Sequence, residues 1–163
     1  MGIQKLRRIK EVFTRLELEV KYLEHVAVIT SEDASKTRGF ELKQGVKALL
    51  FTNDKEYVIV DVPADEKVDV KKLANFVGWE KKNIRMASPD EVLEVTGCEI
   101  GAVPPFGHKD KLRILFDGKI FENRESVFNI GLRTNSAVVK ASYLRRAFNF
   151  VGAEEGDFVK EKV

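Results

Sequence analysis

Lys47 is the side chain whose type and surroundings are best suited to chemistry. It lies in the segment Gly45-Val46-Lys47-Ala48-Leu49-Leu50-Phe51, where its neighbours are apolar. Alternation along a strand would put Lys47 on the same face as Leu49 and Phe51. One interpretation is a lysine on an edge strand that deters aggregation. The other is a partly desolvated ammonium group that holds an anionic or carbonyl oxygen.

Cys98 and the histidines His25 and His108 form the second set of reactive side chains. A nucleophilic cysteine needs a neighbouring base and an oxyanion hole, and His108 is ten residues from Cys98 in a flexible loop. We therefore favour a buried, unreactive thiol. The histidines and carboxylates have no metal-ligand spacing, and the sequence contains no P-loop, dinucleotide fingerprint or Ser-His-Asp constellation. We expect chemistry without a metal or cofactor.

The loop from Thr96 to His108 is the most irregular segment of the chain. Three of the 11 glycines and two of the four prolines fall inside it, so it cannot form a helix or a plain strand. Such a loop can leave backbone N–H groups pointing at a ligand. Because Gly101 permits a close approach, we predict a backbone clamp there for a carbonyl or oxyanion. The alternative is a tight surface crossing without a ligand.

Helices and strands must position these groups, and periodicity predicts where they lie. Apolar residues at three- and four-residue steps predict an amphipathic helix over residues 3–23. Two apolar runs, Val46–Thr52 and Tyr57–Val62, predict a hairpin. Further helices are predicted to begin near Thr30 or Ser31, Asp69, Ser88 and Ser142, and further strands to include residues 84–87, 112–116, 119–121, 126–129 and 137–140. Asp117-Gly118 predicts a hairpin turn, and the charged tail from Gly152 is expected to be frayed.

These elements and the composition predict a single α+β domain with a mixed sheet surrounded by helices. The 163 residues are the length of one domain. A net charge of only +2 argues against a protein that coats nucleic acid, so any RNA contact would be local. One cysteine excludes an internal disulfide, and we expect a cytoplasmic protein. The sequence shows neither a signal peptide nor an apolar run long enough to span a membrane.

The order of the segments resembles the YbaK/ProX family of aminoacyl-tRNA editing domains, whose fold also occurs as the editing insertion of bacterial prolyl-tRNA synthetase. The resemblance extends from about His25 to Phe148. It rests on residues 25–34, Gly45–Leu50, Tyr57–Val62, Val70–Leu73, Thr96–Gly107, Asp117, Phe128–Gly131 and Tyr143-Leu144. It implies that residues 25–150 form the deacylase domain, that the helix in residues 1–24 belongs to the same domain, and that residues 151–163 are a charged C-terminal tail.

The resemblance implies an enzyme that deacylates mischarged tRNA in trans, without a metal or an obvious protein nucleophile. Lys47 would be the strand lysine that contacts the tRNA 3′ end or the aminoacyl ester. Gly101 would be the loop glycine whose backbone holds the substrate carbonyl or α-amino group, and Ala102 would supply a further N–H donor. The substrate-binding residues implied in addition are His25, Thr30, Ala102, Phe106, Gly107, Gly131 and Ser136.

Two departures from the family pattern lie near the predicted pocket. Several bacterial members read Gly-Lys-Arg-Gly-Leu-Asp after the late glycine, whereas this chain has Gly131-Leu132-Arg133-Thr134-Asn135-Ser136. Ser136 thus replaces an acidic residue. Pro104 precedes Pro105 where the family often has a small polar residue. We expect these differences to change which amino acid is accepted.

Three functions fit the sequence. The first is hydrolysis of mischarged tRNA, with the tRNA 3′ end as partner. The second is a non-catalytic module that binds aminoacyl-tRNA or an aminoacyl-tRNA synthetase, with the helix over residues 3–23 as docking element. The third is hydrolysis of an acyl ester other than tRNA. The residues leave open which amino acid is removed, whether a synthetase is required, and the oligomeric state.

Overall fold

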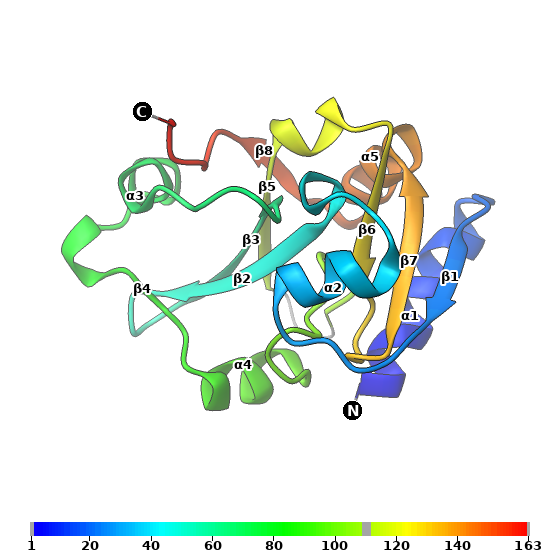
Figure 1. Cartoon of the computed structure of the whole chain (residues 1–163). Coiled ribbons are helices and arrows are strands. Elements are labelled where there is room, and N and C mark those ends of the chain that lie inside the picture. Colours follow the sequence, from blue (N-terminus) through cyan, green and yellow to red (C-terminus); the bar gives the residue numbers. More distant parts are fainter. Residues whose placement is uncertain (1, 109–111, 163) are drawn as a thin grey trace.

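Two sheets form the framework of the computed structural model, which describes residues 2–108 and 112–162 (Figure 1). The three-stranded antiparallel sheet has the order β1 (Lys21–Glu24), β7 (Asn135–Lys140), β6 (Glu125–Asn129). The five-stranded sheet has the order β4 (Arg85–Met86), β2 (Val46–Thr52), β3 (Tyr57–Pro63), β5 (Arg113–Asp117), β8 (Glu154–Gly156). In it β2 is antiparallel to β3 and β4, while β5 is parallel to β3 and β8. The predicted α+β class with a mixed sheet is confirmed.

Helices cover the sheets, and most of them begin where the capping residues predict. In the described residues they are α1 (Gly2–Arg15), α2 (Ser31–Arg38), α3 (Val70–Val77), α4 (Pro89–Thr96) and α5 (Ala141–Val151), with short 3-10 helices η1 (Leu42–Gln44), η2 (Lys81–Asn83) and η3 (Gly118–Glu122). Side-chain oxygens of Thr30, Asp69 and Ser88 cap α2, α3 and α4. The predicted cap at Ser142 is wrong, because α5 begins after Lys140 without a side-chain cap. None of these helices combines the length and the apolar character needed to cross a membrane.

The main hydrophobic core lies between the two sheets. The Phe106 ring makes edge contacts with Phe13 of α1, Phe128 of β6 and Phe148 of α5. A second core covers the other face of the large sheet beneath α3, so α3 and α1 lie on opposite sides of the molecule (Figure 1). Because both faces of the large sheet are buried, the register of β2 and β3 is strongly determined.

The N-terminal helix is shorter than the predicted span of residues 3–23. α1 ends at Arg15, Glu17 adopts the left-handed region with φ 56°, and the chain turns into β1. The Leu18 N–H closes this turn on the Phe13 carbonyl at 3.0 Å. Leu16, Leu18 and Val20 still pack against the main core. Because these residues are apolar and partly buried, the apolar pattern continues past the end of the helix and predicted a longer one.

The predicted hairpin turn at Asp117-Gly118 is also wrong. The Asp117 carboxylate accepts the Lys119 N–H at 2.8 Å and begins η3, which replaces the strand predicted over residues 119–121. A carboxylate at this position can cap a helix as well as start a turn, and here the cap forms.

The C-terminal tail is ordered rather than frayed. β8 pairs with β5, and Phe158 and Val159 are buried in the second core. The Phe158 N–H donates to Asp117 Oδ2 at 2.7 Å, so one carboxylate holds both η3 and the tail. Burial of these apolar residues outweighs the charge of their neighbours. Met1 and Val163, at the ends of the predicted segments, lie outside the described residues.

Candidate active site

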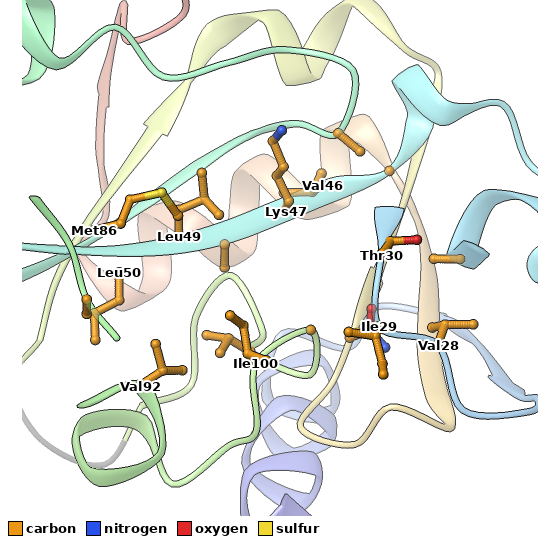
Figure 2. Close-up of a pocket in the computed structure, with 18 of the residues that line it drawn as sticks. Val28, Ile29, Thr30, Val46, Lys47, Leu49, Leu50, Met86, Val92 and Ile100 are labelled. Carbon is orange, nitrogen blue, oxygen red and sulfur yellow. The ribbon is translucent and has the colours of Figure 1, made fainter. Parts of the chain in front are cut away.

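The candidate site is a cavity of about 170 Å³ along one edge of β2 (Figure 2). On one side β2 pairs with β3 over its whole length, whereas on the other side β4 covers only Phe51 and Thr52. The segment Val46–Leu50, which we call the free edge, lines the cavity. Figure 2 shows this strand above Val92 and Ile100. The cavity therefore lies where the sheet is left open.

Backbone groups of the free edge also face the cavity. The Leu50 carbonyl accepts the Ala87 N–H at 2.9 Å, so the Leu50 peptide groups point away from β3. The Gly45 carbonyl points the other way, since it accepts the Ala64 N–H at 2.8 Å. Peptide groups alternate along a strand, so those of Ala48 point to the free edge as those of Leu50 do. The Ala48 N–H is a candidate donor to a substrate oxygen.

Lys47 lines the cavity and is half-buried. Desolvation lowers the pKa of its ammonium below the ordinary lysine value, while the charges of Glu32, Asp65 and Glu66 oppose that shift. A partly desolvated cation attracts an oxygen anion more strongly than one in bulk water. Lys47 also belongs to the free edge, where a charged side chain opposes pairing with another strand. The two interpretations of this lysine are compatible.

Gly101 is required by two features of the backbone. Its φ is +85°, which side-chain-bearing residues rarely adopt, and a Cβ would stand 2.8 Å from the Ile29 carbonyl oxygen. Both Gly101 and Ile29 line the cavity. The loop therefore brings Gly101 directly against the segment before α2, and together they form the wall facing β2.

Ala102 does not offer the free donor that was predicted. Its N–H donates to the Glu99 carbonyl at 2.9 Å, and its own carbonyl accepts the Gly131 N–H at 3.0 Å. Ala102 is also buried and outside the cavity lining. The Ala102 N–H is therefore bonded within the turn over residues 99–102 and is not available to a substrate.

Phe106, Gly107 and Gly131 likewise lie outside the cavity lining. Their positions do not support the direct substrate contact that was predicted for them. Phe106 is fully buried in the main core. A Cβ on Gly107 would stand 2.7 Å from the Ile9 side chain, and one on Gly131 would stand 2.6 Å from the Gly2 carbonyl oxygen. All three therefore pack towards α1 or the core, and they position the cavity loop indirectly.

Thr30, His25 and Ser136 occupy neighbouring positions with different access to the cavity. Thr30 lines it, and its Oγ1 accepts the Asp33 N–H at 3.1 Å. Ser136 is fully buried, with its Oγ 2.8 Å from His25 Nε2. His25 and Ser136 lie outside the lining, so they support the wall that carries Thr30 rather than forming its surface.

Sequence reasoning missed Arg38 and Asn129, which line the cavity from the last turn of α2 and the end of β6. Arg38 Nη1 donates to Ser136 Oγ at 3.0 Å, which joins it to His25. An arginine at the end of a helix ordinarily signals interaction with the helix dipole, so nothing in the sequence marked Arg38 as a cavity residue. The further lining residues are mainly apolar and include Val28, Ala34, Met86, Ala87 and Val103.

Cys98 and His108 take no part in the cavity lining. Cys98 is buried, as predicted, and burial raises the pKa of its thiol, which disfavours the reactive thiolate. Lys5 Nζ lies 3.0 Å from His108 Nδ1, and because an ammonium can only donate, Nδ1 accepts and Nε2–H donates to the Pro104 carbonyl at 3.1 Å. Burial and the Lys5 charge lower the His108 pKa to about 3. His108 therefore ties the double-proline loop to α1.

Within residues 2–108 and 112–162, no group of three or more His, Cys, Asp or Glu side chains could hold a metal ion. The arrangement offers instead a small, mostly apolar cavity with an ammonium group, a guanidinium group and a free strand edge. These groups can bind and polarise an oxygen of a ligand.

Comparison with known sequences finds a matching family and several relatives of this chain. The family model of the aminoacyl-tRNA editing domain matches residues 25–147. The multifunctional Ser/Thr-tRNA deacylase ProXp-y of Escherichia coli (strain K12) is 36% identical over 135 residues, which cover 79% of this chain and 80% of that protein. The proline–tRNA ligase of Brachyspira hyodysenteriae (strain ATCC 49526 / WA1) is 29% identical over 135 residues, which cover 78% of this chain and 23% of the ligase.

A solved structure agrees with these sequence matches. The crystal structure of a candidate trans-editing enzyme for prolyl tRNA synthetase superimposes with a TM-score of 0.80 and 28% sequence identity. The match covers 96% of this chain and 98% of that one, so the similarity extends to the N-terminal helix and the C-terminal strand.

Proposed function

This chain belongs to the aminoacyl-tRNA editing domain family, and we propose that it hydrolyses the ester bond of mischarged tRNA in trans. One observation carries the proposal: Lys47 and Gly101 line the same cavity beside the free edge of β2. The family resemblance seen in the sequence is confirmed by the match to residues 25–147. The division into residues 1–24, 25–150 and 151–163 stays a prediction.

The cavity is the seat of the aminoacyl group. Its volume of about 170 Å³ is close to that of an apolar cavity of roughly 150 Å³ that holds a benzene ring. A whole aminoacyl-adenosine is much larger, so the ribose and base lie at the mouth. This geometry leaves the ester between the cavity and the solvent, within reach of attacking water.

Lys47 and the backbone supply electrostatic stabilisation. In hydrolysis the oxygen of water bonds to the carbonyl carbon, the ester C–O bond breaks, and the ribose hydroxyl leaves with a proton. Negative charge develops on the carbonyl oxygen, and in this proposal the Lys47 ammonium and the Ala48 N–H, both in the cavity wall, stabilise it. Removing one such donor raises the activation free energy by an amount on the order of 3 kcal/mol, which slows the reaction.

The substrate is a small aminoacyl group, with serine and threonine as first choices. The cavity volume limits the side chain, and the relative at 36% identity is named a Ser/Thr-tRNA deacylase. Thr30 and Asn129 give the lining neutral polar groups that can bond to a side-chain hydroxyl. A methylene more or less in the substrate changes the binding free energy by only about 1–3 kcal/mol, so several small amino acids are accepted.

A panel of mischarged tRNAs tests the function and the role of Lys47 together. We expect the wild type to hydrolyse tRNA charged with serine or threonine, and Lys47→Ala to lose roughly a hundredfold or more in kcat/KM. Lys55→Ala, in the exposed turn of the same hairpin, is the matched control and should retain activity. If no tRNA in the panel is deacylated, the enzymatic function is wrong. If Lys47→Ala stays as active as Lys55→Ala, the role of the lysine is wrong.

The proposal also includes how tRNA is bound and in which cellular compartment the protein acts. We infer that tRNA phosphates contact the exposed basic residues Arg7 and Lys10 of α1, that the ester reaches the cavity without a synthetase, and that the protein acts in the cytoplasm, where tRNA is charged. A net charge of +2 gives little general attraction to RNA, so these contacts are local.

A further inference from the structure

The cavity holds two cationic side chains and no carboxylate. Arg38 and Lys47 both line it, and the other lining residues are neutral. The carboxylates that influence Lys47, those of Glu32, Asp65 and Glu66, lie outside the lining. A small, mostly apolar cavity with two positive charges favours a negatively charged group.

Arg38 has one side fixed and another without a partner. Its Nη1 donates to Ser136 Oγ at 3.0 Å, and Ser136 is fully buried. Its Nη2 lies 3.7 Å from the position that a Cβ on Gly45 would take, just before the strand that carries Lys47. Its Nε is buried and finds no acceptor among the described residues. The guanidinium group therefore extends from α2 to the start of β2, next to the cavity.

The charge of Arg38 also differs from that of the paired arginines, because it is partly buried without a carboxylate partner among the described residues. Arg85 binds the carboxylates of Asp54 and Glu91, and Arg113 binds Glu154. No carboxylate in the described part of the chain forms such a pair with Arg38, and burial lowers its pKa to about 10. The group is still protonated at neutral pH, and an uncompensated charge of this kind is costly to bury. A bound anion would balance it.

We propose that Arg38 and Lys47 form an oxyanion subsite in which Arg38 binds a negatively charged oxygen of the substrate. The identity of the substrate rests on the proposed function. Aminoacyl-tRNA offers two sources of such an oxygen: the phosphodiester before the terminal adenosine, and the oxyanion that develops on the ester carbonyl. A guanidinium group can donate to either.

Kinetics on two substrates separate these sources. The substrates are the aminoacyl-tRNA that the wild type hydrolyses fastest and the matching 3′-O-aminoacyl adenosine, which has no phosphate. We expect Arg38→Gln to lower kcat/KM for the tRNA roughly ten- to a hundredfold, the loss typical of one charge-assisted hydrogen bond. Arg38→Lys should retain part of the activity. A loss on the tRNA alone identifies the phosphodiester, and an equal loss on both substrates identifies the ester oxyanion.

Two further variants guard against a purely structural role. Ser136→Ala removes the hydrogen bond that fixes Arg38 but keeps the charge, so it should lose less than Arg38→Gln. Arg145→Gln removes a guanidinium group on α5 that pairs with Glu155, and it should match the wild type. The subsite is overturned if Arg38→Gln is within twofold of the wild type on both substrates, or if Ser136→Ala loses as much as Arg38→Gln.

Binding of small nucleotides keeps the subsite testable without turnover. Adenosine 5′-monophosphate carries the phosphate that precedes the terminal adenosine, and adenosine lacks it. If the wild type hydrolyses no ester, the proposed function fails. The subsite then stands if the wild type binds the monophosphate at least tenfold more tightly than adenosine by calorimetry and Arg38→Gln loses that preference. Without such a preference in the wild type, the subsite fails as well.

Discussion

Gly101 shows how closely a single residue can be constrained at the cavity wall. Its φ of +85° disfavours any side chain, and the Ile29 carbonyl oxygen would stand 2.8 Å from a Cβ. The first constraint is shared by several glycines that end helices, among them Gly78 with φ +77° and nothing within 4 Å of a Cβ. The second constraint is a contact across the cavity wall.

Comparing Gly101→Ala with Gly78→Ala separates the two constraints. Adopting the left-handed region costs a residue with a Cβ about 1–2 kcal/mol, which Gly78→Ala should show in urea unfolding. Gly101→Ala should lose more stability and also at least tenfold in kcat/KM, because the wall must move. If the two variants lose equal stability and both remain fully active, the close approach to Ile29 has no functional role.

The cavity also shows which residue types are informative in sequence. Lys47 was conspicuous because its neighbours are apolar, and it does line the cavity. Arg38 was not conspicuous, because arginines at helix ends are common, yet it lines the same cavity. Arg38 is important because no carboxylate of the described residues pairs with it, and the order of residues in the sequence does not show this.

At the scale of elements, α1 is the support of the cavity loop. Ile9 and Phe13 are buried in the main core, and Phe106 of the loop contacts the Phe13 ring at a centroid distance of 5.7 Å. Gly107 and Gly131 allow the loops to approach this helix. The helix was predicted as a docking element; its inner face packs in the core, and the RNA contacts that we propose lie on its exposed outer face.

Truncation of Phe13 tests this support. Phe13→Ala should lower the free energy of unfolding by about 3–5 kcal/mol, the usual loss for a phenylalanine in a core. Thr14→Ala, on the exposed face of the same helix, should change it by less than about 0.5 kcal/mol. Urea unfolding followed by circular dichroism measures both. A loss below 1 kcal/mol for Phe13→Ala would mean that α1 is not part of the cooperative unit.

β2 and its short partner β4 determine where the cavity can exist. β4 pairs with only Phe51 and Thr52 of β2, and the Ala87 N–H bonds to the Leu50 carbonyl, so β4 does not cover Val46–Leu49. A longer β4 would cover the free edge and remove the cavity. The length of this edge strand is therefore a functional feature of the fold.

Across the whole molecule, a buried carboxyl group links stability to pH. Asp61 on β3 is fully buried, its two side-chain oxygens lack partners among the described residues, and burial raises its pKa well above 3.8. The folded state thus keeps a proton that the unfolded chain releases above about pH 4. The contribution of Asp61 to stability is complete below that pH and is lost as the pH rises towards the raised folded-state pKa.

Asp61→Asn isolates this effect, because asparagine keeps the shape without ionising. The free energy of unfolding of the wild type, minus that of Asp61→Asn, should fall as the pH increases from 4 to 8. The slope is at most about 1.4 kcal/mol per pH unit for one proton. Denaturant unfolding at several pH values gives the difference. A difference that stays constant or rises would show that Asp61 is not held neutral.

Much of the fold could be predicted because it depends on neighbouring residues. Capping residues marked the starts of α2, α3 and α4, and two apolar runs marked β2 and β3. The errors arose where distant contacts override local pattern. Residues after Arg15 form β1 because β7 is available to pair with it, and the charged tail forms β8 because β5 has an open edge.

The sequence by itself determined the family, the α+β class and the importance of Lys47 and Gly101 as candidates, since these follow from residue types and their order. Only the tertiary structure decided the composition of the cavity. It uses the Ala102 N–H in a turn, buries Phe106 in the core, and joins Arg38 to Ser136 across 98 positions of the chain. The physical reason is that hydrogen bonds and burial are set by which segments meet in space. Neither can be read from spacing along the chain.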